Sequence, residues 1–399
     1  MLNVITREEA VRMVRALAQN RETATETIPT ADALGRYLAA PVRAAEDVPG
    51  FDRTTVDGYA VLARDTYGAS DAMPSQLDVI GEIAMGQAAG AIRSGQCFRI
   101  STGGMLPQGA DAAVMVEHTD ETQGLCLVYK AVSPGENITV RGADVRAGDI
   151  VLTPGARMTP ASVGVLAALG IERVEVFRPC SAAVLSTGDE LTRGAPAPGQ
   201  IRDVNSDLLA SSLSAMGCAA DVFPALPDDR GAIRDAIRSA AETHDAVFVS
   251  GGSSAGMRDL TVSVLDELGE VLFHGLAMKP GKPTILGLVG GKPVFGLPGH
   301  PLAAYFVLRL VFAEYFRASY AVPPDAPFRV GKTAVNIPSN HGREEFCCAT
   351  LAPDGSVAPI HTKSGIISVL TRSNCILRIP RESEGLPAGA ETELYRLFL

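Results

Sequence analysis

The sequence predicts a multidomain protein that joins a doubly wound α/β domain to β-rich parts. From about residue 179 to 320, strand-like apolar runs alternate with helical runs, which is typical of a parallel sheet with helices on both faces. Within this region we expect a hairpin-like pair at 283–299 and one long closing helix at 301–318. Short strand-like runs and turn residues fill 52–152. They return after residue 324, where they predict a small barrel or sandwich.

Composition and charge exclude several classes of protein. The chain has 399 residues, of which 46% are hydrophobic and 20% charged, so extensive disorder is not expected. The net charge of −10 argues against nucleic acid as the main partner, although a small anion could bind in a local basic pocket. Seven cysteines without a CxxC pair indicate neither a disulfide framework nor a zinc finger. No signal segment and no apolar run of about 18 residues is present, so we expect a cytoplasmic protein without a membrane partner.

Capping signals mark two helices outside the α/β region. Thr6 and Glu9 have the spacing of a capping box, and apolar residues then recur on one helical face. Thr159, which precedes a proline, predicts the N-cap of the second helix. We expect residues 7–26 and 146–175 to pack together as a discontinuous helical domain around the β-rich part.

Three loops of the α/β region follow predicted strands, where ligands bind in open α/β sheets. The first loop, 187–191, carries the adjacent acids Asp189 and Glu190. Two carboxylates at a strand end suit Mg²⁺, which binds a few carboxylates together with water and phosphate oxygens. The alternative is an ordinary turn in which an acid caps a helix.

The second loop, 251–256, is rich in glycine and serine and leads to Asp259 and a helix. Such a turn presents backbone N–H groups and a helix N-terminus to an anion. Asp259 would repel a phosphate directly but would accept it through a bridging metal. A plain strand-to-helix turn is the alternative.

The third loop places Lys279 and Lys282 on a turn stiffened by proline and glycine. It is not a P-loop, because the glycine spacing differs and Pro283 stands where a P-loop has Ser or Thr. The two lysines predict a fixed cationic patch, with a solvated basic turn as the alternative. Elsewhere, Asp57 and Gly58 taken alone signal a turn.

Motifs spread over nearly the whole chain occur together in the order typical of one family. They are FDRTTVDGYAV, RISTGGMLPQGADAAV, PGENITVRGADV, LSTGDEL, GQIRDVNS, VSGGSSAGMRDL, MKPGKPT, GLPGHP and a weak GRxxF near the C-terminus. Any one of them is weak evidence, whereas the ordered set is highly specific. The chain resembles the MoeA/gephyrin E-domain family of molybdopterin molybdenumtransferases.

The resemblance implies four domains with approximate bounds. They are a discontinuous helical domain (1–26 and 146–177), a β-rich domain (27–145), a MoaB-like α/β molybdopterin-binding domain (178–323) and a C-terminal β-barrel domain (324–399). It also implies an elongated homodimer, with the site in a cleft between the α/β and β-rich parts of two subunits.

The activity implied by the resemblance belongs to molybdenum cofactor biosynthesis. The metal of molybdate is inserted into adenylylated molybdopterin, and AMP is released in a Mg²⁺-dependent reaction. An upstream adenylyltransferase and downstream cofactor-inserting proteins are implied as partners. The alternatives are a specialised or non-catalytic paralogue that binds molybdopterin, one that uses tungstate, or a generic adenylate enzyme.

The resemblance also assigns site residues by motif. The catalytic candidates are Asp57, Glu190, Ser254 and Asp259, and the candidate Mg²⁺ ligands are Asp57, Asp189, Glu190 and Asp259. The candidate substrate-binding residues are Thr102, Asp144, Asp228, Gly251, Gly252, Ser253, Lys279, Lys282 and Ser364. Three positions depart from the family pattern: Thr139 and Cys348 stand where the family has Arg, and His300 where it has Asn.

Overall fold

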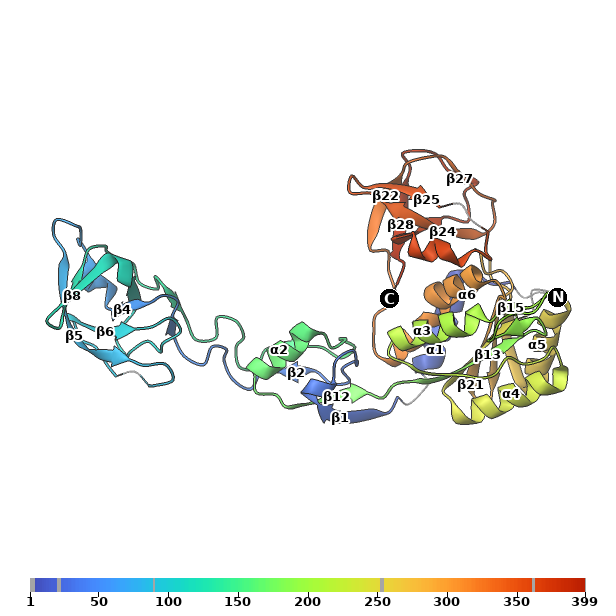
Figure 1. Cartoon of the computed structure of the whole chain (residues 1–399), viewed down its shortest axis with the longest axis horizontal. Coiled ribbons are helices and arrows are strands. Elements are labelled where there is room, and N and C mark those ends of the chain that lie inside the picture. The colour runs from blue at the N-terminus through green and yellow to red at the C-terminus, as the bar shows by residue number, and fades with distance from the viewer. Residues whose placement is uncertain (1–3, 20–22, 89, 252–254, 361–362, 399) are drawn as a thin grey trace.

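The molecule is elongated (Figure 1), and the computed structural model describes residues 4–19, 23–88, 90–251, 255–360 and 363–398. A β domain lies at one end, and the chain enters and leaves it through extended segments (Figure 1). A small middle region follows, with α2 (Pro160–Ala168), β1 (Thr25–Pro29) and β12 (Arg173–Phe177). The α/β domain, with a second β-rich unit beside it, forms the other end (Figure 1).

The α/β domain is built on a six-stranded sheet. Its strands are β13 (Ser181–Thr187), β16 (Ala219–Val222), β17 (Ala246–Gly251), β18 (Gly269–His274), β20 (Ile285–Val289) and β21 (Lys292–Leu297). Their order is β16-β13-β17-β21-β20-β18, and β20 runs antiparallel to both of its neighbours. The sheet is therefore mixed and not wholly parallel as predicted. The predicted hairpin of β20 and β21 is the reason, since Gly290 and Gly291 both have the positive φ of a two-residue hairpin turn.

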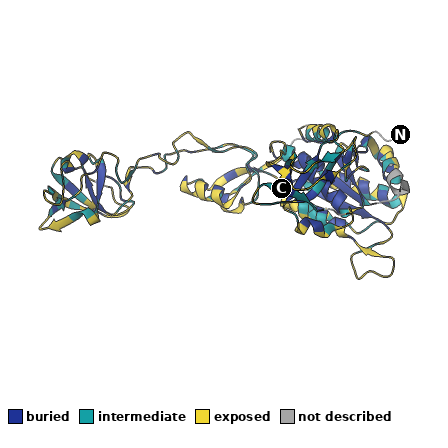
Figure 2. Ribbon diagram, turned by 90° about the horizontal axis from the view of Figure 1, so that it is seen from above, coloured by how far each residue is buried: buried dark blue, intermediate teal, exposed yellow. Residues whose placement is uncertain are grey.

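Helices cover both faces of this sheet, so the predicted doubly wound fold is confirmed. They are α3 (Val204–Ala215), α4 (Arg230–Thr243), α5 (Ala255–Leu268), α6 (Pro301–Val307) and α7 (Ala313–Ser319). Successive side chains of a strand point to opposite faces. Ala182 and Val184 of β13 accordingly pack with α3, α6 and α7, whereas Ala183 and Leu185 pack with α4 and α5. Figure 2 shows the buried sheet enclosed between the two helical layers.

The long helix predicted at 301–318 is interrupted. A π-helical segment, η4 (Leu308–Phe312), separates α6 from α7, and all of its residues are buried. Arg309 in this segment donates from Nε to the Arg396 carbonyl at 3.1 Å and pairs with Asp325 at 2.6 Å. An apolar pattern does not distinguish a π turn from an α turn, so the interruption has no signal in the sequence.

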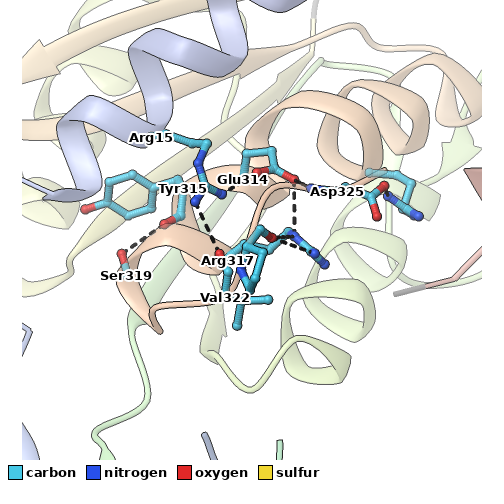
Figure 3. Close-up of polar contacts among 9 residues, drawn as sticks. Arg15, Glu314, Tyr315, Arg317, Ser319, Val322 and Asp325 are labelled. Atoms are coloured by element: carbon cyan, nitrogen blue, oxygen red, sulfur yellow. Dashed lines mark hydrogen bonds and ion pairs between the residues drawn. The ribbon is translucent and has the colours of Figure 1, made fainter. Parts of the chain in front are cut away.

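The N-terminal helix α1 (Arg7–Gln19) begins with the predicted capping box. The Thr6 backbone N–H donates to the Glu9 carboxylate at 2.8 Å, and the Glu9 N–H donates to the Thr6 hydroxyl at 3.2 Å. The helix then packs against α7, where Arg15 pairs with Glu314 at 2.6 Å and donates to the Val322 carbonyl (Figure 3). The buried face of α1 thus belongs to the core of the α/β domain.

The expected packing of the first helix with the second is therefore wrong. The second helix, α2, has the predicted Thr159 cap but packs in a separate core with Leu38, Met158 and Val176. What does bring the two chain segments together is the antiparallel pairing of β1 with β12. Amphipathic periodicity shows that a helix has an apolar face but not which partner covers it.

The β domain is built from short strands, as predicted for the β-rich part. They are β4 (Gly58–Val61), β5 (Ser75–Ile83), β6 (Gln96–Ile100), β7 (Ala112–Met115), β8 (Thr119–Thr122) and β9 (Leu125–Val128), in the order β7-β4-β6-β5-β9-β8. Tyr59, Leu77, Val114 and Val128 contribute to its core. Short pairs flank it: β3 (Arg53–Thr54) with β10 (Ile138–Thr139), and β2 (Val42–Arg43) with β11 (Ile150–Leu152).

The C-terminal unit is a closed β-barrel, which decides between the predicted barrel and sandwich. Its strands are β22 (Arg329–Thr333), β24 (Glu344–Leu351), β25 (Ser356–Pro359), β26 (Cys375–Ile379) and β28 (Glu391–Arg396). Among these five strands the order is β24-β25-β22-β28-β26, and the pairing of β24 with β26 closes the ring. A short strand of the α/β domain, β19 (Met278–Lys279), adds in parallel to β24.

Minor elements complete the chain. The remaining paired strands are β14 (Leu191–Thr192) with β15 (Ile201–Arg202) and β23 (Ile337–Pro338) with β27 (Gly385–Leu386). The 3₁₀ turns are η1 (Thr30–Asp32), η2 (Ala63–Thr66), η3 (Val116–His118) and η5 (Ile367–Thr371). Within the described ranges, no helix is long and apolar enough to cross a membrane.

Candidate functional site

A crevice opens where the strand order of the α/β sheet reverses. From β13 the chain passes through α3 to β16 on one side, and from β16 it passes through α4 to β17 on the other. The carboxyl ends of β13 and β17 are therefore neighbours, and Thr187 lies opposite Gly251. This is the position at which doubly wound sheets bind ligands. The cavity, which we call the switch crevice, has a volume of about 400 Å³.

Gly251 keeps the two strand ends close together. A Cβ atom at this position would lie 1.9 Å from Thr187 Oγ1 and 2.6 Å from the Thr187 carbonyl oxygen. Any larger residue would push the loops apart. The glycine predicted from the second loop thus has a steric role at the crevice, which both Thr187 and Gly251 line.

The acids predicted near the first loop gather beside this crevice. Glu190 lines it, and Asp189 Oδ1 accepts a hydrogen bond from the Asp228 backbone N–H at 3.2 Å. Burial raises the pKa of Asp228, and the negative charges of Asp189 and Glu190 raise it further. The three carboxylates are therefore close enough to interact electrostatically. Across the described part of the chain, no three His, Cys, Asp or Glu side chains are arranged so that they alone could hold a metal ion.

The start of α3 contributes two polar side chains to the crevice that the sequence analysis did not single out. Asp203 caps the helix and accepts hydrogen bonds from the Ser206 N–H and the Ser186 hydroxyl, both at 3.1 Å. Asn205 donates from Nδ2 to Ser250 Oγ at 2.6 Å and to the Gly299 carbonyl at 2.9 Å. An acid just before a helix is a cap signal in the sequence. The contacts of Asn205 with the end of β17 and with the loop after β21 have no such signal.

A second cavity, the lysine crevice, lies between the third loop, α6 and the barrel. It has a volume of about 380 Å³, and Lys279, Lys282, Arg343 and Ser364 line it. The two predicted lysines are therefore together, and Ser364 is brought to them from the C-terminal part of the chain. Lys282 and Arg343 have exposed side chains.

Lys279 is paired with an acid, which the sequence analysis did not predict. Because β19 pairs with β24, Lys279 lies opposite Glu345, and their charged groups are 2.9 Å apart. The sequence offers no signal for this pair, since β19 and β24 are far apart along the chain. The Lys279 side chain remains 47% exposed, so an anion can still reach it.

The turn between the lysines depends on Gly281. Its φ is +124°, and a Cβ atom there would lie 2.6 Å from Val307 Cγ2 of α6. A larger residue would meet both a strained backbone and a collision. The turn is thus held against α6 at a fixed distance.

Two thiols face the lysine crevice in their protonated form. Burial raises the pKa of Cys347 to about 12, assisted by the charge of Glu345, and burial raises the pKa of Cys348 to about 11. At neutral pH neither cysteine supplies a thiolate. Cys348, which departs from the family pattern, therefore adds no charge to the crevice.

His300 joins the two crevices. It lines both of them, with Gly365 on one side and Ser364 on the other. The acids of the switch crevice and the cations of the lysine crevice thus lie in neighbouring cavities that share His300 as a lining residue. This residue is another departure from the family pattern, and it has an exposed side chain.

Of the site residues predicted in the β-rich part, Asp57 and Thr102 are in contact with each other, and Asp144 is not shown to join them. Asp57 Oδ1 accepts hydrogen bonds from the Thr102 N–H at 2.7 Å and from the Thr102 hydroxyl at 3.1 Å. Asp144 is exposed next to the bridge between Val48 and Val145. The β domain and the α/β domain are at opposite ends of the molecule (Figure 1), so one chain does not bring Asp57 to the crevices.

Part of the second loop lies outside the described residues. This applies to Gly252, Ser253 and Ser254, and also to the side chain of Asp259 in α5. Their assignments stay predictions.

Comparisons with known proteins cover all parts of the chain. Residues 5–170 match the family model of the MoeA N-terminal region (domain I and II), residues 183–318 the model described as “Probable molybdopterin binding domain”, and residues 330–397 that of the MoeA C-terminal region (domain IV).

Similar proteins are known from archaea and bacteria. A relative from Methanocaldococcus jannaschii, named for molybdopterin biosynthesis, is 35% identical over 92% of this chain and 90% of its own. A molybdopterin molybdenumtransferase from Staphylococcus aureus is 30% identical over 98% of this chain and 95% of its own. The crystal structure of a molybdopterin biosynthesis MoeA protein from Pyrococcus horikoshii matches 98% of this chain and 100% of that chain. Its TM-score is 0.86 and its sequence identity 30%.

Proposed function

This chain belongs to the MoeA family of molybdenum cofactor biosynthesis, and on that premise we propose that it is a molybdopterin molybdenumtransferase. Its substrates are molybdate and adenylylated molybdopterin. The metal enters the dithiolene of the pterin, and AMP is released.

The observation that carries this proposal is that the two crevices are neighbours and share His300. At one end lie Glu190 and Gly251, beside the reversal of strand order, and at the other end lie Lys279 and Lys282. A pterin linked to a nucleotide through a pyrophosphate needs a long site of this kind. Molybdate is a doubly charged oxyanion, and compact ammonium groups are suited to bind it.

The acids of the switch crevice fit a magnesium ion. Asp189, Glu190 and Asp228 are hard oxygen donors whose mutual repulsion a divalent cation would relieve. They do not form a complete cage among the described residues, which agrees with the preference of Mg²⁺ for water and phosphate oxygens as further ligands. Bound there, Mg²⁺ would neutralise charge on the pyrophosphate. Asp259 and Asp57 remain the other candidate ligands.

The chain's own groups then have separate tasks. The glycine-rich segment that starts at the end of β17, with Gly251, Gly252 and Ser253, is assigned to bind phosphate through backbone N–H groups. Ser254 and Asp259 are assigned to the scissile bond, where Asp259 positions water or metal. Lys279, Lys282 and Ser364 bind the oxyanion.

A second copy of the chain supplies the residues that lie far from the crevices. In a homodimer, Asp57, Thr102 and Asp144 of one subunit complete the site of the other. This arrangement accounts for the distance between the β domain and the α/β domain in a single chain (Figure 1).

Release of AMP tests the proposal directly. The protein is incubated with adenylylated molybdopterin and Mg²⁺, with molybdate, tungstate or neither, and AMP is measured. We expect release that depends on molybdate. Release with tungstate alone would indicate a tungsten-specific paralogue, and absence of release with either oxyanion would indicate a non-catalytic molybdopterin-binding protein.

A further inference from the structure

We propose that Asn205 and Ser250 recognise the hydrogen-bonding edge of an amino-substituted heterocycle in the switch crevice. The inference rests on the proposed function, because both the pterin and the adenine of adenylylated molybdopterin are rings of this kind. It assigns to two uncharged residues the task of selecting the ring, apart from the acids and cations that handle the phosphates and the metal.

The orientation of the Asn205 amide is fixed by its neighbours. Its Nδ2 lies 2.9 Å from the Gly299 carbonyl oxygen, which can only accept a hydrogen bond. The nitrogen must therefore face Gly299, and the reverse orientation of the amide would set two acceptors against each other. A second hydrogen bond, to Ser250 Oγ at 2.6 Å, uses the other N–H of the same group.

This orientation leaves the carbonyl oxygen of Asn205 without a donor. Asn205 is only 8% exposed, and its Oδ1 has no hydrogen-bond partner among the residues that the structure describes. Buried acceptors are almost always satisfied, and an unsatisfied one requires an explanation. Asn205 lines the switch crevice, so a ligand in this cavity can supply the missing donor.

Ser250 provides the complementary group. It is 1% exposed, lines the same crevice and accepts the hydrogen bond of Asn205. Because its oxygen serves as that acceptor, its O–H proton is directed elsewhere. The two side chains thus offer an acceptor and a donor next to each other.

An adjacent acceptor and donor select for one kind of ligand edge. Phosphate and molybdate oxygens are acceptors and would be repelled by Asn205 Oδ1. The 6-amino group and N1 of adenine provide a donor beside an acceptor, and so do the 2-amino group and N1 of a pterin. Sites built to hydrogen-bond a ligand N–H reject analogues that lack it, because the buried protein group is then unpaired.

Two pairs of probes distinguish the rings. AMP is compared with purine riboside 5′-monophosphate, which lacks the amino group. Pterin-6-carboxylate is compared with lumazine-6-carboxylate, in which a carbonyl replaces the amino group. We expect calorimetry to show that the wild-type protein prefers the amino-bearing member of one pair about tenfold. The pair that shows the preference identifies the ring.

Variants connect the preference to these residues. Asn205→Ala should abolish the preference, whereas Ser211→Ala, an exposed change on the same helix, should retain it. If Asn205→Ala does not fold, Ser250→Ala carries the test, with about fivefold weaker binding of the amino-bearing ring expected. No preference in either pair, a preference that survives Asn205→Ala, or unchanged binding by Ser250→Ala would overturn the inference.

The AMP-release assay separates this inference from the proposed function. A wild-type protein that turns over but shows no preference in either pair would leave the function intact and remove the inference. A preference that depends on Asn205, in a protein that releases no AMP, would support the inference and overturn the function.

Discussion

At the scale of single residues, the lysine crevice shows how a cation can be held ready for an anion. Lys279 is paired with Glu345, while Lys282 and Arg343 remain exposed in the same cavity. An incoming oxyanion must compete with a carboxylate for one lysine and finds the other cations free to approach. Under the proposed function, the affinity for the oxyanion therefore depends on Glu345 as well as on the lysines.

Lys279→Ala tests the role of the paired lysine. We expect the molybdate concentration for half-maximal AMP release to rise about tenfold, because one charge-assisted contact is lost. The requirement for adenylylated molybdopterin should change much less. Lys292→Ala is a suitable control, because Lys292 pairs with Asp245 at the opposite end of the sheet. An unchanged molybdate requirement would assign Lys279 a different role.

Glu345→Gln should have the opposite effect. It keeps the shape of the side chain and removes the negative charge 2.9 Å from Lys279. We expect the molybdate requirement to fall a few-fold (~0.5–1 kcal/mol), and the effect to be weaker at high salt. A higher requirement would mean that Glu345 holds Lys279 in place for the substrate.

The protonated thiols of the lysine crevice make a pH-dependent prediction. Because burial raises the pKa of Cys348 to about 11, iodoacetamide at pH 8 should leave it unmodified in the folded protein and label it after unfolding. The same shift contributes stability that is complete below the ordinary thiol pKa of about 9 and is lost as the pH rises toward 11. Mass spectrometry of the peptide that contains Cys348 measures the extent of labelling. Rapid labelling of the folded protein at pH 8 would contradict the prediction.

At the scale of elements, local signals predicted where helices and strands form, but not which elements pack against one another. The capping box at Thr6, the N-cap at Thr159 and the alternation of strands and helices in the α/β domain depend on neighbouring residues, and the structure confirms them. The packing of α1 on α7 and the addition of β19 to the barrel depend on segments far apart in the sequence. The hydrophobic periodicity of a segment does not indicate which distant segment it packs against.

The same division applies to the candidate site. The acids and lysines could be predicted, because charged residues follow strands in recognisable motifs. Glu345 and Asn205 were not singled out, because their importance comes from what lies opposite them in space. Glu345 reaches Lys279 through the parallel pairing of β24 with β19, and Asn205 contacts the carbonyl of Gly299 in a distant loop. The local sequence indicates neither contact.

The attachment of α1 can be tested through Glu314. This buried acid of α7 pairs with Arg15 of α1 at 2.6 Å and with Arg317 at 3.2 Å, and it accepts the Asp325 N–H (Figure 3). Glu314→Ala should lower the free energy of unfolding by about 2–4 kcal/mol, since it leaves these donors unpaired. Urea denaturation measures the loss.

Glu267→Ala is the matched control for Glu314→Ala. Glu267 pairs with Arg230 at the surface, where ion pairs contribute about 0–1 kcal/mol. Equal effects of the two variants would mean that the contact between α1 and α7 contributes no more than an exposed ion pair.

At the scale of the whole molecule, the elongated shape separates two groups of predicted site residues. Asp57 and Thr102 are hydrogen-bonded to each other in the β domain, while Glu190 and the lysines are at the other end (Figure 1). A catalytic role for both groups requires that two chains share each site. Closed twofold symmetry then produces two equivalent sites per dimer.

Mixing two inactive variants tests whether the site is shared. Asp57→Ala and Asp259→Ala should each abolish AMP release as pure proteins. After unfolding and refolding together in equal amounts, about half of the dimers are mixed, and each mixed dimer has one site that carries neither substitution. The expected activity is therefore about a quarter of the wild-type value. If both residues of a site came from the same chain, every site would retain a substitution and mixing would restore nothing.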